Sequence, residues 1–203
     1  MQADLPIAVM LIHGGSLLDA QTGAVTMVAP GGLPRQRPLE LACGMRLICR
    51  GYPGSVQLRS PSFTHGTTIP TKHTCDGLNV SPELTWADLP SGARSLALRV
   101  LDPDAPSGTF THWLIWDLDP RAGGIREGRV PEEAREGKNG FGDVGYGGPC
   151  PPARRGVHHY HFELIALREP IILDQGASRE AFDAAVRDQR LEVAELVGLY
   201  ERR

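Results

Sequence analysis

The chain has 203 residues, of which 41% are hydrophobic and 22% are charged, and its formal net charge at pH 7 is −3. These values are typical of an ordinary soluble globular domain with a core of its own. The 19 Arg and 2 Lys form no dense run. This spacing indicates basic residues scattered over a solvated surface, and we expect no nucleic-acid partner.

Membrane insertion and secretion find little support in the sequence. No stretch reaches the ~18 to 20 consecutive apolar residues of a membrane helix. The N-terminal run "LPIAVMLI" follows Asp4 and has no basic residue before it, which makes it a poor signal peptide. We therefore expect no integral membrane span and a cytoplasmic location, where thiols are normally reduced. The four cysteines, at 43, 49, 75 and 150, match no zinc-binding spacing.

Residues 1–54 differ in texture from the rest of the chain. They are rich in Gly and Pro, contain no Phe or Trp, and show no sustained period. We expect a poorly structured N-terminal extension, with Met45 as a candidate true start. The alternative is a lid or dimerisation arm in which "LPIAVMLIHG" adds an edge strand.

From Val56 onward, alternating patterns predict strands near residues 56–59, 84–89, 95–101, 110–118 and 158–167. Residues 120–156 are mostly loop, which in a compact domain is usually functional or disordered. Ser178 is a plausible N-cap for a helix over 179–188. A second helix is predicted from Val193, Leu196, Val197 and Tyr200, which follow an i, i+3, i+4, i+7 spacing. Strands first and helices last predict a β-dominated α+β domain over residues 55–203.

The strand "HHYHFELIAL" at 158–167 carries three histidines, which alternation divides between its two faces. His159, His161 and Glu163 share one face and could bind iron or zinc, but a solvated polar face is the commoner explanation, so we expect no metal. His158 and Tyr160 point to the other face, directly after a rigid loop rich in Gly and Pro.

Two further segments carry polar residues at a strand end. His112 lies at the start of the strand 110–118, where it is expected to share a core-facing side with Leu114, Trp116 and Leu118. Asp102 and Asp104 of "DPDAP" lie on one side if the chain stays extended. They can equally be turn-forming aspartates before proline. The histidines and aspartates together suggest a pocket.

Five motifs in this order resemble the phosphatidylethanolamine-binding protein family, and most closely its bacterial branch of Raf-kinase-inhibitor-like proteins. They are "SPELTW" (81–86), "DPDAP" (102–106), "THW" (111–113), "GYGGPCPP" (145–152) and "HHYHFELIAL" (158–167). The likeness covers residues 56–203. It implies a β-sandwich-like domain with a small anion pocket at one end, which binds phosphate or a phosphoryl head group.

The resemblance also implies which residues line the pocket. They are Asp102, Asp104, His112, Gly148, Pro149, His158 and Tyr160. Imidazole and phenol groups supply hydrogen-bond donors to phosphate oxygens, and backbone N–H groups of the Gly-rich loop could form an anion-binding nest. The family often has Arg at the position of His159, whose side chain we expect to point away from the pocket. By analogy with the family, the Ala105–Pro106 peptide bond is expected to be cis.

Two classes of function remain in competition. The first is a non-enzymatic binding or regulatory protein that needs no cofactor and recognises a phosphorylated small molecule or anion. Family members are linked to inhibition of kinases or serine proteases, so a protein partner is also considered. The second is a hydrolase or acyl transferase in which Cys150, His158 and Asp102 form a nucleophilic triad. Cys75 and Cys150 are expected to be free thiols, or at most a redox-sensitive pair.

Overall fold

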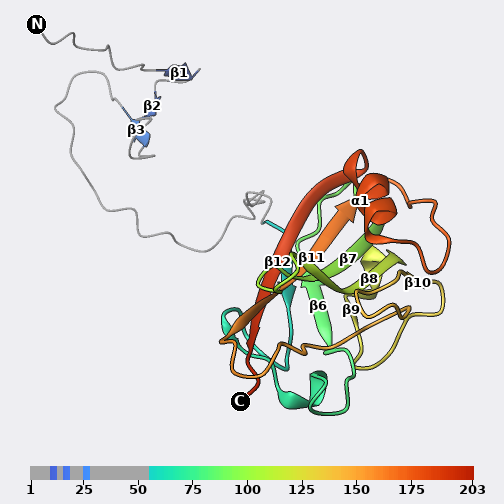
Figure 1. The fold of residues 1–203 in the computed structure, drawn as a ribbon. Helices are drawn as coiled ribbons and strands as arrows, with labels where there is room; N and C mark the ends of the chain where they lie inside the picture. Colours follow the sequence, from blue (N-terminus) through green and yellow to red (C-terminus); the bar gives the residue numbers. More distant parts are fainter. Residues whose placement is uncertain (1–9, 13–15, 19–24, 28–54) are drawn as a thin grey trace, which may run out of the picture. The chain divides into compact units, whose positions relative to one another are not determined.

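Long antiparallel strands dominate residues 55–203, which with residues 10–12, 16–18 and 25–27 are the part of the chain described by this computed structural model (Figure 1). The chain divides into two units between Cys49 and Arg50. In the first unit, β1 (Met10–Ile12), β2 (Ser16–Leu18) and β3 (Val25–Met27) form an antiparallel sheet in that order. Apart from these strands, the expected extension over 1–54 and the alternative start at Met45 lie outside the described residues.

A six-stranded sheet organises the second unit, with the strand order β10-β8-β7-β11-β12-β5. Its long members pair antiparallel with their neighbours, and β5 runs parallel to β12. Their bounds are β5 Thr67–Thr68, β7 Ser95–Asp102, β8 Phe110–Leu118, β10 Arg135–Glu136, β11 His158–Leu167 and β12 Arg190–Tyr200.

A second sheet packs against one face of the first. It contains β4 (Gln57–Arg59), β6 (Leu84–Ala87) and β9 (Gly124–Ile125), in the order β4-β6-β9. Apolar side chains of both sheets form one buried cluster, in which Phe63 and Phe162 lie with ring centroids 5.5 Å apart. This is the arrangement of a β-sandwich, in which the inward faces of two sheets share a core.

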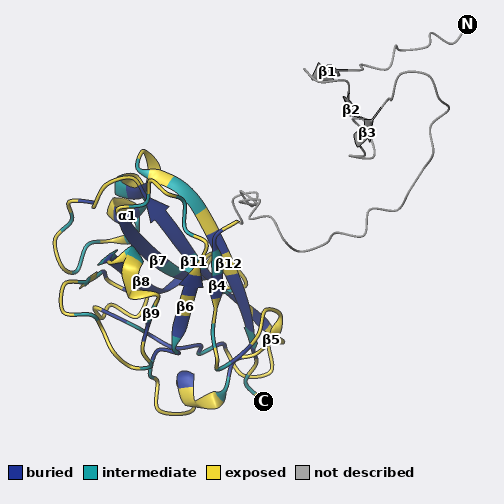
Figure 2. Ribbon diagram, turned by 180° about the vertical axis from the view of Figure 1, so that it is seen from behind, coloured by how far each residue is buried: buried dark blue, intermediate teal, exposed yellow. Residues whose placement is uncertain are grey.

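The opposite face of the large sheet is covered by α1 (Arg179–Arg187), whose N-cap is Ser178 as predicted. Phe182 of the helix packs on Trp116 of β8, with ring centroids 6.1 Å apart. Because both faces of the sheet are covered, its central strands β7, β8 and β11 are buried along almost their whole length (Figure 2). Two short 3-10 helices, Thr71–His73 and Pro120–Ala122, complete the unit.

The expected β-dominated fold is confirmed, but the second C-terminal helix is wrong. Residues 190–200 form strand β12, which pairs with β11 from His158↔Tyr200 to Leu167↔Arg190. The apolar spacing imitated a helix because the C-terminal half of β12 is buried on both sides, so successive apolar residues need not alternate. Val193, assigned to the buried helix face, is 38% exposed.

Two bulges in β8 break the alternation expected for that strand. Opposite β7, Val100 pairs with Trp113 but Leu101 pairs with Thr111, so His112 is the extra residue. The second bulge lies between Ile115 and Leu118 and contains Asp117, whose φ is +59°. A β-bulge re-aims side chains and bends its strand.

The bulges correct the predicted side of His112. Leu114 and Trp116 lie in the cluster beneath α1, whereas Leu118 lies in the core between the sheets. His112, which was expected to share one face with all three, instead packs its ring against Tyr160 of β11. The residues described here contain no cis peptide bond, so the expectation for Ala105–Pro106 is wrong.

Candidate functional site

Three strands of the large sheet bring the predicted polar residues to one end. β7 ends at Asp102, while β8 begins at Phe110 opposite Asp102 and β11 begins at His158. Because the neighbours are antiparallel, the end of β7 lies between the starts of β8 and β11. Asp102, His112, His158 and Tyr160 are all buried there. We call these four side chains the polar cluster.

Asp102 has two roles in the polar cluster. Its Oδ2 atom lies 2.8 Å from Nδ1 of His158, and its Oδ1 atom accepts a hydrogen bond from the backbone N–H of Asp104 at 2.8 Å. The second contact is an Asx-turn, which bends the chain at the end of β7. The turn also means that the two aspartates do not share one side of an extended chain. Asp104 is an exposed residue at the edge of the cluster.

The imidazole of His112 is held by the loop before β11. Its Nδ1 atom lies 2.7 Å from the carbonyl oxygen of Gly147, and its ring meets that of Tyr160 edge-on at a centroid distance of 5.1 Å. Burial lowers the pKa of His112, and the Gly147 carbonyl opposes this only in part. The neutral ring therefore donates from Nδ1 and carries a lone pair on Nε2.

Tyr160 is fully buried, and its hydroxyl oxygen has no hydrogen-bond partner among the described residues. Burial, with a smaller contribution from the charge of Asp102, raises the pKa of the phenol, which therefore stays protonated. A buried hydroxyl without a partner costs about 1–3 kcal/mol. Within the polar cluster it is the group most in need of a bound acceptor.

Hydrogen bonds hold the loop 145–152 from several sides, and they occupy the N–H groups of its three bonded glycines. The N–H groups of Gly145, Gly147 and Gly148 donate to Gly137, His112 and Asn79 respectively. Pro149, Pro151 and Pro152 have no N–H to offer. The glycine at 148 is required for space, because a Cβ there would lie 2.3 Å from the carbonyl oxygen of His73.

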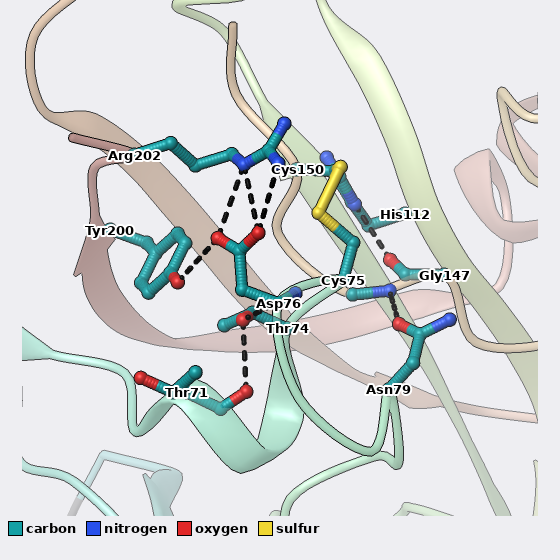
Figure 3. The surroundings of a disulfide bond; sticks show 11 residues. Thr71, Thr74, Cys75, Asp76, Asn79, His112, Gly147, Cys150, Tyr200 and Arg202 are labelled. Atoms are coloured by element: carbon teal, nitrogen blue, oxygen red, sulfur yellow. Dashed lines mark hydrogen bonds and ion pairs between the residues drawn. A yellow bond between two sulfur atoms is a disulfide. The ribbon is translucent and has the colours of Figure 1, made fainter. Parts of the chain in front are cut away.

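A disulfide joins this loop to residues 74–79 (Figure 3). Cys75 and Cys150 have Cα atoms 5.4 Å apart, and the N–H of Cys75 donates to the carbonyl of Pro149 at 3.1 Å. The expectation of free thiols is wrong. Since the sulfur of Cys150 is bonded to Cys75, the proposed thiolate nucleophile does not exist in this state, and the Cys–His–Asp alternative falls with it.

Sequence reasoning missed the residues around the disulfide. Asp76 accepts hydrogen bonds from the hydroxyl of Tyr200 at 2.8 Å and from Arg202 at 3.0 Å, and these two groups hold its pKa below the usual range (Figure 3). Asn79 accepts from Gly148 and has a φ of +55°. The available signal was the turn sequence "DGLN", because Asn is one of the few residues that tolerate a left-handed backbone.

The three residues of the possible metal face are engaged separately. His159 pairs with Asp104 at 2.7 Å, His161 pairs with Glu195 at 2.7 Å, and Glu163 pairs with Arg99. No group of three metal-ligating side chains occurs in the part of the chain that the structure describes. His159 therefore does point away from the buried cluster, but it also binds Asp104, a connection that strand alternation alone does not reveal.

The fold and the polar cluster define a β-sandwich domain with buried polar groups at one end of its larger sheet. The chain belongs to the phosphatidylethanolamine-binding protein family, whose model matches residues 59–201. A UPF0098 protein of Pyrococcus abyssi is 40% identical over 173 residues, which cover 82% of this chain and 97% of that protein. LppC of Mycobacterium tuberculosis, described as a candidate lipoprotein, is 40% identical over 71% of each chain.

Two solved structures of the family share the fold. A homologue from Chlamydia trachomatis is 36% identical with a TM-score of 0.69, and covers 73% of this chain and 99% of its own. YbcL of E. coli is 30% identical with a TM-score of 0.71, and covers 74% of this chain and all of its own. Membership supports a binding or regulatory protein in general terms. Among the described residues no helix is long and apolar enough to cross a membrane, and the cytoplasmic location stays a prediction.

Proposed function

We propose that this chain is a non-enzymatic binding protein that recognises phosphate or a phosphoryl head group at the polar cluster. The observation that carries the proposal is the buried hydroxyl of Tyr160, which has no hydrogen-bond partner among the described residues and belongs to a ring packed edge-on against His112. We also assign Asp104, Gly148 and Pro149 to the proposed site, as the family resemblance implies.

The donors for the anion are side chains, because the N–H groups of the three loop glycines are already used. The phenol of Tyr160 donates directly. His158 faces Asp102 through Nδ1 at 2.8 Å, so the carboxylate fixes the orientation of the imidazole and leaves Nε2 for the ligand. His112 must take up a proton to become a donor at Nε2, and the bound anion offsets the cost of charging it.

Replacing Tyr160 by Phe tests the proposal with little disturbance of packing. In a titration with inorganic phosphate or phosphoethanolamine followed by calorimetry, we expect affinity to fall about 10- to 100-fold, because hydrogen bonds to charged groups contribute about 1.5–3 kcal/mol. The free protein should be as stable as before, or more stable, because an unpaired buried hydroxyl has been removed. Unchanged phosphate affinity in Tyr160→Phe contradicts the proposal.

A further inference from the structure

A hollow lies at the opposite end of the large sheet from the polar cluster. It has a volume of about 680 Å³, within the size range of small-molecule sites. Its walls come from the start of β7, the end of β8, the residues around η2 (Pro120–Ala122) and β10, and the segment 170–174. The seven residue steps from Ser95 to Asp102 along β7 separate it from the cluster by about 23 Å.

Two polar atoms in the wall of this hollow lack hydrogen bonds. The Oγ atom of Ser95 and the Oδ1 atom of Asp117 are both buried and have no partner among the described residues. Ser95 as a whole is only 3% exposed. Burying such groups unpaired is costly, and so they call for a donor that the described chain does not supply.

Asp117 also has an unusual backbone. Its φ of +59° at the second bulge of β8 places a non-glycine residue in the left-handed region. Strained backbone of this kind concentrates at functional sites, where it aims a side chain. Burial raises the pKa of this carboxyl, and the charge of Arg135 compensates only in part.

The charges around the hollow favour a cation. Arg94 is paired with Glu169 at 2.8 Å, and Arg121 is paired with Asp119 at 3.1 Å. Within residues 55–203, the carboxylates of Glu133 and Asp174 have no ion pair.

Arg135 is the remaining cation of the hollow. Its Nε atom is 3.7 Å from Oδ2 of Asp117, and its side chain is 53% exposed. A guanidinium at that distance and exposure is loosely held and can be displaced.

We propose that this hollow binds a small alkyl amine. Its ammonium group displaces Arg135 and donates to the Asp117 carboxylate and to Ser95 Oγ, and its methylene chain packs on the apolar residues Pro170 and Ile171. The proposal is independent of phosphate binding, because it uses other residues at the other end of the sheet.

The experiment uses the full chain and n-butylamine as the probe, with n-butanol and butyrate as its neutral and anionic isosteres. Binding is followed by thermal shift and by amide chemical shifts in two-dimensional NMR. We expect a saturable response to n-butylamine alone, centred on Ser95, Asp117 and Arg135. The melting temperature should rise with probe concentration, as mass action requires.

Variants locate the site. Asp117→Asn should lower the affinity at least about tenfold, and it should fold normally because Asn also adopts a left-handed backbone. Ser95→Ala should lower the affinity several-fold, and Arg135→Gln should raise it by removing the competing cation. Asp143→Asn is the matched control, since it removes an exposed carboxylate that lies outside the hollow and has no ion pair within residues 55–203, and it should change nothing.

Three results overturn the proposal. The first is an equal response to n-butanol, which indicates apolar binding only. The second is an unchanged affinity in Asp117→Asn, or an equal loss in Asp143→Asn, which indicates nonspecific charge attraction. The third is the absence of any saturable response in the millimolar range, which assigns the unpaired atoms to ordered water.

Discussion

The Nδ1 atom of His158 lies 2.8 Å from Oδ2 of Asp102, and both side chains are about 95% buried. Removing one partner of such a buried hydrogen bond is costly, because the other polar group is left buried without compensation. Asp102 also closes the Asx-turn at the end of β7. One carboxylate thus fixes both the imidazole and the chain direction at the proposed site.

Asp102→Asn should therefore weaken phosphate binding more than it disturbs the fold. An amide oxygen can still accept from Asp104 or from His158, but it lacks the charge that strengthens these hydrogen bonds and holds the imidazole in place. We expect a loss of about tenfold in phosphate affinity, equivalent to about 1.4 kcal/mol. Calorimetric titration near neutral pH measures it, with circular dichroism to verify the fold. An affinity equal to that of the wild type would show that the carboxylate of Asp102 is not needed for binding.

The buried His112 makes stability depend on pH. Its folded-state pKa is lowered by burial, while the unfolded chain takes up this proton near pH ~6.5. Below that pH the unfolded state binds more protons, so the contribution of His112 to stability is present above ~6.5 and is lost as the pH falls towards the folded-state pKa. Urea unfolding between about pH 7 and pH 5 should show this loss.

His112→Gln removes the titrating group and should flatten that part of the pH profile. Saturating phosphate should also reduce the slope, since the anion favours protonated His112. The explanation fails if His112→Gln retains the wild-type slope.

The two adjacent histidines should differ in their effect on binding. His158 belongs to the buried cluster, whereas His159 is exposed and pairs with Asp104, whose side chain is 41% exposed. Exposed pairs contribute about 0–1 kcal/mol. We expect His158→Ala to weaken phosphate binding far more than His159→Ala. Equal losses in the two titrations would mean that Asp104 or His159 contacts the ligand directly.

Affinity for phosphoethanolamine should rise as the pH falls towards about 6, because His112 gains a donor at Nε2 when it is protonated. Below about pH 6, protonation of the phosphomonoester itself opposes the gain. Calorimetry in buffers of different ionisation enthalpy would also detect the proton taken up on binding. An affinity independent of pH between about 8 and 6 would contradict proton uptake by His112.

Removing the Cys75–Cys150 bridge should destabilise the domain. The cysteines are 75 residues apart in the sequence, so the bridge closes a long loop in the unfolded chain. A native disulfide typically contributes about 2–5 kcal/mol. Urea unfolding of the Cys75→Ser, Cys150→Ser double variant measures the loss. A dithiol reductant should cause the same loss of stability in the wild type and no further loss in the double variant. A further loss in the variant would show that the reductant acts on a group other than this disulfide.

The N-terminal segment can be tested by deletion. We propose that the domain over residues 55–203 does not need residues 1–44, since the family match begins at residue 59. Deleting them should leave the melting temperature and phosphate affinity unchanged. A fall of several degrees, which for a domain of this size reflects about 1 kcal/mol or more, would show that the segment stabilises the domain.

Local patterns predicted most of the sheet and the members of the polar cluster. The alternation in β11 was correct, with His158, Tyr160 and Phe162 buried and His159 exposed. That pattern is readable because β11 keeps its register with β12 from His158 to Ala166, so its side chains alternate regularly. The family motifs added His112 and Asp102, which strand ends alone could only suggest.

The errors arose where tertiary contacts override local patterns. The sequence of β12 resembled a helix because apolar residues cover both faces of the strand. Only its pairing with β11 identifies it as a strand. The disulfide depends on two loops that meet in space, and no spacing of Cys75 and Cys150 encodes this. The contact that occupies the N–H of Gly148 was unpredictable for the same reason, since Asn79 reaches it from a distant segment.

The central claim is that an anion binds at the polar cluster, and NMR of the imidazole nitrogens of His112 and His158 during a phosphate titration tests it most directly. The account predicts saturable changes at Nε2 of both rings, with His112 becoming protonated as phosphate binds, and much weaker changes at His159. If the resonances of His112 and His158 stay unchanged up to phosphate concentrations that saturate binding elsewhere on the protein, the polar cluster is not the anion site.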